Sequence, residues 1–273
     1  MRVVFLGTGT SPRLERANAA IAVQLSSVVD GRDQGAPPTV ILDTAGGNEV
    51  IRQLQAAGIA LATIQHIFIS HQHFDHSGGL SILLAKVAGQ HGNPITVYAP
   101  SGIIPGLRSV VETQIPGALS TRLAGRLHWH PLQPGESAAL EIGEGEPVRL
   151  TAVAAVHPVP TVGCVLSHNG KRVGYTGDTA FFDGLAAAYA GVDLLIHEAT
   201  KLDDPAADAL YRIAHSTAGD AGRVAAAAGV GRLILTHLGP KPHDAPQAAL
   251  AEACAFFSGP VQVAEDLLTV DLN

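Results

Sequence analysis

The stretch HQHFDH at residues 71–76 is the strongest constraint on the fold of this chain, because it comes directly after the apolar run IQHIFIS at residues 64–70. If that run is a strand, residues two apart face the same side, so His71 and His73 point into one space. Asp75 and His76 reach that space from the far side of a turn. Imidazoles and carboxylates are ligands for zinc, iron or manganese, and the lack of thiolates indicates a catalytic rather than a structural site. The stretch therefore predicts a metal centre at a strand end.

Apolar β-branched runs alternate with alanine-rich stretches along the chain, which is typical of a layered α/β protein. Strands are predicted at 2–6, 19–25, 39–43, 66–70, 95–99, 148–153, 163–167, 172–176, 193–197, 232–236 and 261–264. Helices are predicted at 47–57, 78–89, 102–113, 183–190, 217–228 and 245–256. Each half of the chain holds several strands followed by helices, which favours two sheets between outer helices over one parallel sheet. Ser77 is expected to cap the second helix, and Ser216 or Thr217 the fifth.

Composition limits the kinds of partner. The chain has 273 residues, of which 47% are hydrophobic, and no linker divides it, so we expect one domain over 1–273. The net charge of −7 provides no basic field, so extended nucleic-acid binding is not expected, and a small-molecule substrate fits better. No apolar run reaches the roughly 18 residues that cross a bilayer, so no membrane partner is expected and cytoplasmic localisation is the default. Cys164 and Cys254 form no CxxC pair, and we expect both to be buried small hydrophobic residues.

Further segments carry a resemblance to a known family. The HxHxDH pattern is accompanied by VVFLGTGTSP near the N-terminus and by VILDTAGG, VHPVPTVGCVL, VGYTGDT, LIHEAT, HSTAGDAG and LTHLGP in that order. Together they resemble the ribonuclease Z-like branch of the metallo-β-lactamase superfamily over nearly the whole chain. The resemblance implies a four-layer αββα sandwich and a metal-dependent hydrolase, most similar to a phosphodiesterase.

The resemblance also implies a ligand set for two divalent ions, with zinc as the first choice and iron or manganese as alternatives. One ion takes His71, His73 and His157, the other takes Asp75, His76 and His237, and Asp178 bridges the two. The strand-end positions of His157, Asp178 and His237 support this set independently. Asp43 also ends a predicted strand, and such an aspartate commonly orients a ligand histidine.

The same resemblance implies a catalytic relay in which Glu198 orients His215, while Asp75 contributes to catalysis beside the metals. His215 would then protonate the leaving oxygen. Two divalent ions, with Asp75, Asp178 and a bridging hydroxide, leave about one positive charge, which suits an anionic ester. The implied function is hydrolysis of a small phosphodiester, or of an RNA end, by a hydroxide bound to the dinuclear centre.

Departures from the ribonuclease Z pattern leave alternatives open. Phe74 stands where ribonuclease Z usually has a glycine, and no tyrosine follows LTHLGP. Only 20 residues separate His157 from Asp178, which leaves no room there for a long RNA-binding arm. The first alternative is therefore a hydrolase of another ester class, such as an aryl sulfate, lactone or β-lactam, with Lys241, Arg13 and Phe74 as candidate second contacts. The second is tRNA 3′ processing, and a third is a metal-binding regulator without catalysis.

A homodimer is expected from the resemblance. His197 is expected to be a structural residue at a strand end. Histidines without a motif are expected to be bystanders: His66, His91, His128, His130, His168 and His243.

Overall fold

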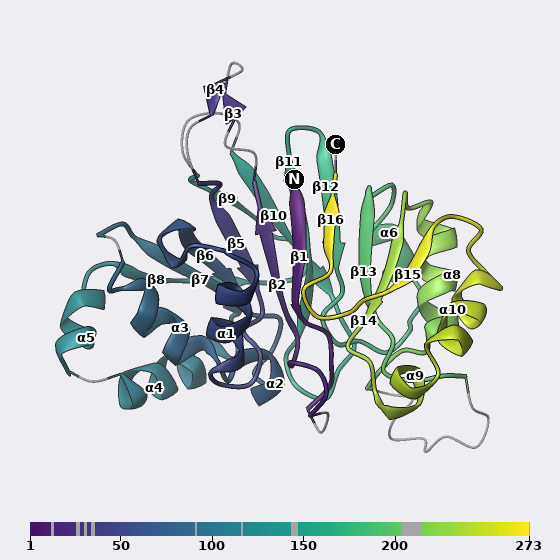
Figure 1. Cartoon of the computed structure of the whole chain (residues 1–273), viewed down its shortest axis with the longest axis horizontal. Helices are drawn as coiled ribbons and strands as arrows, with labels where there is room; N and C mark the ends of the chain where they lie inside the picture. The colour runs from purple at the N-terminus through teal and green to yellow at the C-terminus, as the bar shows by residue number, and fades with distance from the viewer. Residues whose placement is uncertain are drawn as a thin grey trace.

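Two seven-stranded sheets pack face to face at the centre of the molecule (Figure 1). The computed structural model describes residues 1–11, 14–25, 36–90, 92–115, 117–142, 147–203 and 214–272, and only the backbone at 28–29, 32–33 and 118–119. The first sheet has the order β16 (Thr269–Asp271), β1 (Arg2–Gly7), β2 (Ala20–Gln24), β5 (Thr39–Leu42), β6 (Ile64–Phe68), β7 (Ile95–Pro100) and β8 (Leu127–Leu132). The second has the order β15 (Val261–Val263), β14 (Leu233–Thr236), β13 (Leu194–Glu198), β12 (Lys171–Tyr175), β11 (Val162–His168), β10 (Val148–Ala154) and β9 (Ser137–Leu140). A separate hairpin pairs β3 (Val28–Val29) with β4 (Arg32–Asp33).

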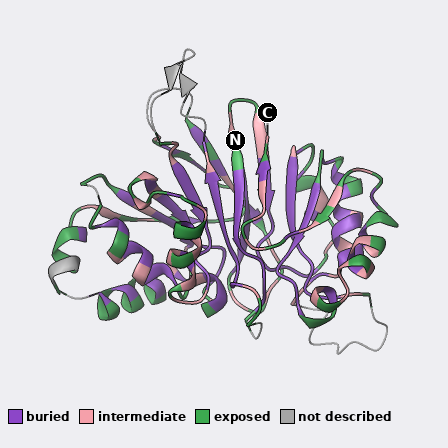
Figure 2. Cartoon of the chain, viewed as in Figure 1, coloured by how far each residue is buried: buried purple, intermediate pink, exposed green. Residues whose placement is uncertain are grey.

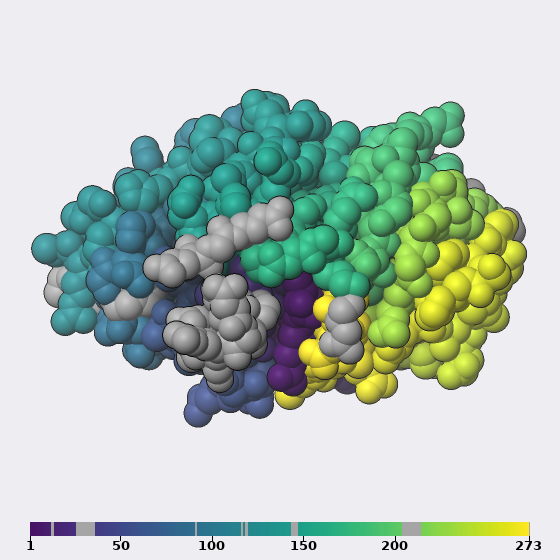
Figure 3. Space-filling view, turned by 90° about the horizontal axis from the view of Figure 1, so that it is seen from above, coloured from purple at the N-terminus to yellow at the C-terminus, as the bar shows by residue number. Residues whose placement is uncertain are grey.

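Helices cover the outer face of each sheet. Packed on or beside the first sheet are α1 (Glu49–Ala56), η1 (Leu61–Thr63), α2 (Phe74–Ser77), α3 (Leu80–Val87), α4 (Ile104–Gln114) and α5 (Gly117–Leu123). Beside the second are α6 (Leu185–Ala188), α8 (Ala218–Ala228), α9 (Pro240–Asp244) and α10 (Pro246–Cys254). Seen from above, the purple N-terminal residues lie between the blue and teal residues of the first half and the green and yellow residues of the second (Figure 3). The predicted αββα sandwich is confirmed.

Side-chain alternation along the strands builds three apolar layers. Val3 and Phe5 of β1 join the core between the two sheets, whereas Val4 and Leu6 pack toward the first layer of helices. A third core lies between the second sheet and its helices, where Val224 is fully buried. Because the central strands are buried on both faces (Figure 2), their sequences are continuous apolar runs rather than alternating ones. That is why these strands were predictable from the sequence.

The missed strands lie at sheet edges. β8 has the sequence LHWHPL and is mostly exposed or half-buried, so it lacks an apolar run, and β9 and β16 are only short edge strands.

Two local predictions are wrong. Ser77 belongs to α2 and donates its hydroxyl to the Gln72 and His73 carbonyls, while Gly79 precedes α3 without a side-chain cap. Cys164 is buried as expected, but Cys254 is exposed.

The strand directions bring the candidate site to one edge of the sandwich. β5 and β6 are parallel neighbours in the first sheet, and β12, β13 and β14 are parallel neighbours in the second. The carboxyl ends of parallel neighbours meet at the same edge, and in Figure 1 this is the lower edge, beside α2 and away from both termini.

Within the described ranges, no helix combines the length and the apolar character that a membrane crossing requires.

Candidate metal centre

Segments that follow six strands supply the predicted site. They follow or end β5, β6, β10, β12, β13 and β14, and they carry Asp43, residues 71–76, His157, Asp178, Glu198 and His237 respectively. Because both sheets contribute, residues more than 160 positions apart along the chain become neighbours. The sequence-predicted ligands therefore meet in one place.

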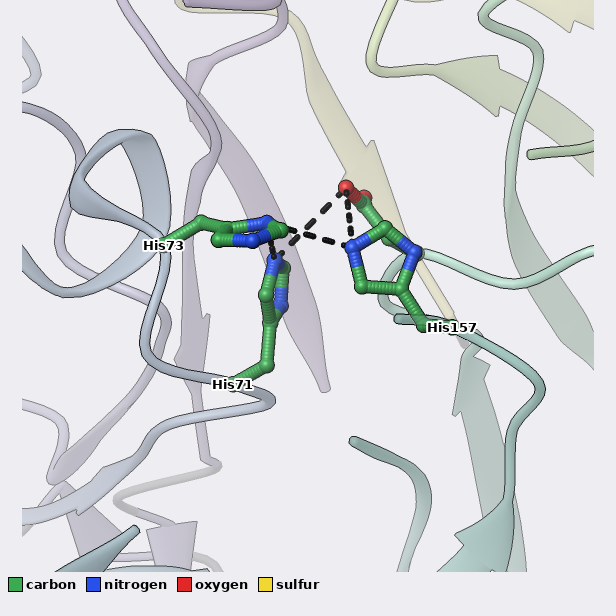
Figure 4. Close-up of side chains that lie close together, drawn as sticks. His71, His73 and His157 are labelled. Atoms are coloured by element: carbon green, nitrogen blue, oxygen red, sulfur yellow. Dashed lines mark hydrogen bonds and ion pairs between the residues drawn. The ribbon is translucent and has the colours of Figure 1, made fainter. Parts of the chain in front are cut away.

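The first cluster consists of His71, His73, His157 and Asp178, whose ligand atoms all lie within 4.8 Å of one another. His73 Nδ1 lies 3.0 Å from His71 Nε2 and 3.1 Å from His157 Nε2. Figure 4 shows the three imidazoles converging beside a carboxylate. This arrangement contains the three predicted histidines of one ion together with the predicted bridging aspartate.

The second cluster consists of Asp75, His76 and His237. His237 Nε2 lies 3.1 Å from His76 Nε2 and 3.5 Å from Asp75 Oδ2. All three residues are buried. These are the three residues that the sequence predicted for the other ion.

Asp178 lies between the two clusters and turns one oxygen toward each. Its Oδ2 is 3.7 Å from His71 Nε2, and its Oδ1 is 3.3 Å from His76 Nε2 and 3.5 Å from His237 Nδ1. A carboxylate that bridges two cations needs this orientation.

The donor atoms fit metal ions chemically. Asp178 Oδ1 is buried and has no hydrogen-bond partner among the residues that the structure describes. Around it, three pairs of imidazole nitrogens face each other at 3.0 to 3.1 Å. In each pair one nitrogen must carry a proton for the other to accept, because two lone pairs that face each other repel. A divalent cation relieves both problems, because it accepts lone pairs from nitrogen and carboxylate oxygen at once. The His and Asp clusters are therefore consistent with a metal site.

Asp43 fixes one side of this site from beneath. The fully buried Asp43 carboxylate accepts hydrogen bonds from His76 Nδ1 at 2.8 Å, the Tyr175 hydroxyl at 2.7 Å, and both the backbone N–H and the hydroxyl of Ser70 at 2.7 Å. The Ser70 oxygen in turn accepts from His71 Nδ1 at 3.0 Å. Because Nδ1 is the donor in both histidines, their Nε2 lone pairs are directed into the site. The contact predicted for Asp43 is present.

Two predicted ligand histidines on the other side are held in the same way. His157 Nδ1 donates to the Ala214 carbonyl at 2.8 Å, and His237 Nδ1 donates to the Thr200 hydroxyl at 2.9 Å. Thr200 was missed by the sequence reasoning. The signal was present, because Thr200 lies two residues after Glu198 at a strand end and such positions share a face.

The predicted relay pair is in contact. His215 Nδ1 donates to Glu198 Oε1 at 3.0 Å, and Glu198 also accepts from the Thr179 N–H and the Thr200 hydroxyl, both at 2.7 Å. His215 Nδ1 is also 3.8 Å from Asp178 Oδ2, and His215, Asp178 and His237 form a third possible ligand group. Since Glu198 already occupies Nδ1 at the shorter distance, we place His215 beside the metal centre rather than in it.

Burial and charge act against each other in this centre. Burial alone would lower the pKa of His215, but the charge and hydrogen bond of Glu198 outweigh it and raise the pKa to about 9. Burial opposes ionisation of Asp75, yet its interaction with His237 and the charge of His76 hold its pKa at about 2. For Asp178, the charges of His237 and His76 likewise outweigh burial, so its pKa lies well below the ordinary value. At neutral pH both carboxylates are thus anionic, as ligands must be.

The helix that follows His215 begins as the sequence predicted. Thr217 caps α8 by accepting from the Asp220 N–H at 3.0 Å, and Asp220 accepts from the Thr217 N–H at 3.1 Å. Ser216 instead donates to the Thr179 carbonyl at 2.7 Å. The turn that carries His215 is therefore fixed on both sides.

A cavity of about 440 Å³ opens onto the centre. Its walls include Asp75, Asp178 and His215 together with Phe74 and Pro240. It is large enough for a small ester. Of the predicted second contacts, Phe74 lines it, Lys241 does not, and Arg13 lies outside the described residues.

The remaining histidines take no part in the clusters. His66 contacts the Tyr98 hydroxyl at 3.2 Å, and His243 Nδ1 accepts from Arg16 Nε at 2.7 Å. Neither these two nor His128, His130, His168 and His197 belong to any possible ligand group in the part of the chain that the structure describes. His91 lies outside that part.

Comparison with known proteins decides the family. A model of the β-lactamase superfamily domain matches residues 39–238, which is well over half of the chain. The chain belongs to the metallo-β-lactamase superfamily. Its hydrolase class, predicted from the sequence, is thereby confirmed.

Relatives within this superfamily align along the full chain. A ribonuclease Z of Prochlorococcus marinus is 26% identical over 328 aligned residues, covering 100% of this chain and 98% of the relative. A ribonuclease Z of Natronomonas pharaonis is 29% identical, with the same coverage. The crystal structure of the short form of human tRNase Z is 26% identical and covers 100% of both chains at a TM-score of 0.76. YhfI from Bacillus subtilis, a metallo-β-lactamase fold protein, is 23% identical with a TM-score of 0.76 and 99% coverage of both chains, which supports the fold.

Proposed function

We propose that this chain is a phosphodiesterase that hydrolyses a small anionic phosphodiester at a centre of two divalent ions, with zinc as the expected metal. The observation that carries this proposal is the placement of Asp178, whose two oxygens face two separate His/Asp clusters. Similarity to ribonuclease Z proteins along the full chain supports phosphodiester chemistry. The first cluster would hold one ion and the second cluster the other, with Asp178 shared.

Bound divalent ions supply Lewis acidity and lower the pKa of water toward 7, so no strong protein base is needed for the attack. The protein must then bind the anion and protonate its leaving oxygen. Asp75 and Asp178 remove only part of the charge of two divalent ions, so a net positive charge faces the cavity. A phosphodiester monoanion is complementary to that charge.

His215 is the proposed acid. Its Nδ1–H is committed to Glu198, so the transferable proton is the one on Nε2. In the metal-free protein Glu198 raises the pKa of His215 to about 9, which favours the protonated ring, and His215 lines the cavity where the ester would lie. Glu198, held by Thr179 and Thr200, keeps the ring in place while the proton leaves.

The test is turnover by purified, zinc-loaded protein against a panel of esters. The panel holds bis(p-nitrophenyl) phosphate, a cyclic nucleotide, an aryl sulfate, a lactone and a β-lactam. We expect the phosphodiesters to be hydrolysed fastest, and a replacement of Asp178 by Ala to abolish the activity. Replacement of the exposed His128 by Ala is the matched control and should leave the activity unchanged. Faster turnover of the sulfate, lactone or β-lactam with two ions bound would replace this proposal by the other ester class.

A second candidate is tRNA 3′ processing, which is favoured by the ribonuclease Z relatives and by human tRNase Z. The net charge of −7 argues against it, because RNA binding depends on neutralising phosphates. Cleavage of a precursor tRNA at its 3′ end by the same preparation, at a rate above that for bis(p-nitrophenyl) phosphate, would establish it.

A further inference from the structure

The side chain of Phe74 is 59% exposed although both of its neighbours, His73 and Asp75, belong to the metal clusters. Among the described residues, other large hydrophobic side chains are also exposed, but Phe74 is the one of them that lines the cavity. An exposed aromatic ring between two members of the metal clusters is informative, because the packing of the core does not require it there. It is available to a ligand instead.

The position of Phe74 beside the cavity is fixed by its backbone. It is the first residue of α2, and its carbonyl accepts from the Gly78 N–H at 2.7 Å. One edge of its ring lies near the turn after Asp43, since a Cβ built on Gly46 would stand 3.5 Å from Phe74 Cε2. More than half of the residue's surface remains exposed.

The charges around the cavity limit what can lie on this ring. Asp75 and Asp178 are anionic, and the described lining residues include no lysine or arginine. The metal ions of the proposed function compensate about one negative charge of the substrate. The one cationic side chain among these lining residues is His215, which the proposed function assigns to the leaving oxygen. A second phosphate or a carboxylate on the substrate has no further cationic partner there, so groups beyond the reacting phosphate are best uncharged.

We infer that the substrate is a phosphodiester monoanion with an uncharged aromatic ester group, whose ring stacks on Phe74. This inference rests on the proposed phosphodiesterase function and adds the substrate class. Phe74 acts as a specificity-determining residue, because an offset-stacked ring adds affinity beyond burial of its area. Ring recognition here requires no contact between Phe74 and the metals.

Binding calorimetry with zinc-loaded protein tests the inference without turnover. The probes are diphenyl phosphate and dimethyl phosphate, which carry the same charge on the same phosphate and differ only in their ester groups. We expect diphenyl phosphate to bind the wild type at least about tenfold more tightly. Phe74→Ala should weaken diphenyl phosphate by about tenfold and change dimethyl phosphate less than about twofold.

Matched variants show whether the ring itself matters. Phe74→Leu keeps an apolar side chain but removes the ring, so it should also lose most of the preference. Phe181→Ala removes an aromatic side chain that is 44% exposed but does not line the cavity, and it should bind like the wild type. Zinc content should be the same in every protein, because Phe74 offers no ligand atom.

Three results would overturn the inference: equal binding of the two probes by the wild type, equal weakening of both probes by Phe74→Ala, or tighter binding of the phenyl phosphate dianion than of diphenyl phosphate. Failure of the proposed function has a different signature. In that case bis(p-nitrophenyl) phosphate is not hydrolysed by protein with two ions bound, whichever probe binds better.

Discussion

His76 Nδ1 donates a 2.8 Å hydrogen bond to Asp43 Oδ2, and both side chains are fully buried. Because of this bond, His76 directs Nε2 into the second cluster, 3.1 Å from His237 Nε2. Asp43 directly follows β5, whereas His76 lies in α2, so the orientation of a predicted ligand depends on a residue 33 positions away. Interactions of this kind tune metal affinity without touching the metal.

Asp43→Asn should weaken zinc binding by roughly 10- to 100-fold, because an amide can donate to His76 and so favour the wrong tautomer. Competition with a chromogenic chelator measures this affinity. Asp183→Asn, at an exposed position outside the site, is the control and should bind zinc like the wild type. Unchanged affinity in Asp43→Asn would show that His76 is oriented by other contacts.

The stoichiometry of the centre separates a bridging aspartate from an ordinary ligand. Wild-type protein should hold close to two transition-metal ions per chain, and Asp178→Ala should reduce the occupancy of both sites, since its oxygens face both clusters. His157→Ala should mainly reduce the occupancy of the first cluster. Elemental analysis after gel filtration measures the content, and an active wild type without metal would contradict the entire assignment.

The leaving group of the substrate tests the role of His215. His215→Ala should lower kcat by roughly 10²- to 10⁴-fold for a phosphodiester with an alkyl leaving group, which needs a proton. The loss should be distinctly smaller for nitrophenolate, which leaves without one. Glu198→Gln should show the same dependence more weakly, and metal content should barely change in either variant. Equal losses for both leaving groups would mean that His215 is not the acid.

The ion pair of His215 with Glu198 has a pH signature in the metal-free protein. The folded-state pKa of His215 is raised from 6.5 to about 9, so its stabilising contribution is complete below about 6.5 and is lost as the pH rises through about 9. Glu198→Gln should therefore destabilise the fold clearly near pH 7 and much less above pH 10. Urea unfolding at these pH values measures the difference, and NMR titration should place the wild-type imidazole near 9. A midpoint near 6.5 would contradict the buried ion pair.

The amino-acid sequence by itself determined the features that depend on neighbouring residues. Four predicted ligands within 71–76 were identifiable because a strand end and a turn bring them together locally. The cap before the alanine-rich helix was narrowed to Ser216 or Thr217, and the structure selects Thr217. The doubly buried strands were identifiable as apolar runs. The ligands from distant strands, such as His237, were assigned through resemblance rather than through local pattern.

Tertiary structure alone decided which atoms face each other. The choice of Nε2 over Nδ1 in His76, His157 and His237 depends on acceptors that are distant in sequence, namely Asp43, Ala214 and Thr200, and only the fold brings these acceptors to the rings. Tyr175 carries no local signal for its contact with Asp43 that distinguishes it from a core residue. The edge strand β8 exists because β7 offers unpaired backbone groups, which no apolar pattern at 127–132 indicates. Local sequence encodes the apolar pattern of the strands and helices and the turns between them, whereas long-range packing and hydrogen bonding set the geometry of the site.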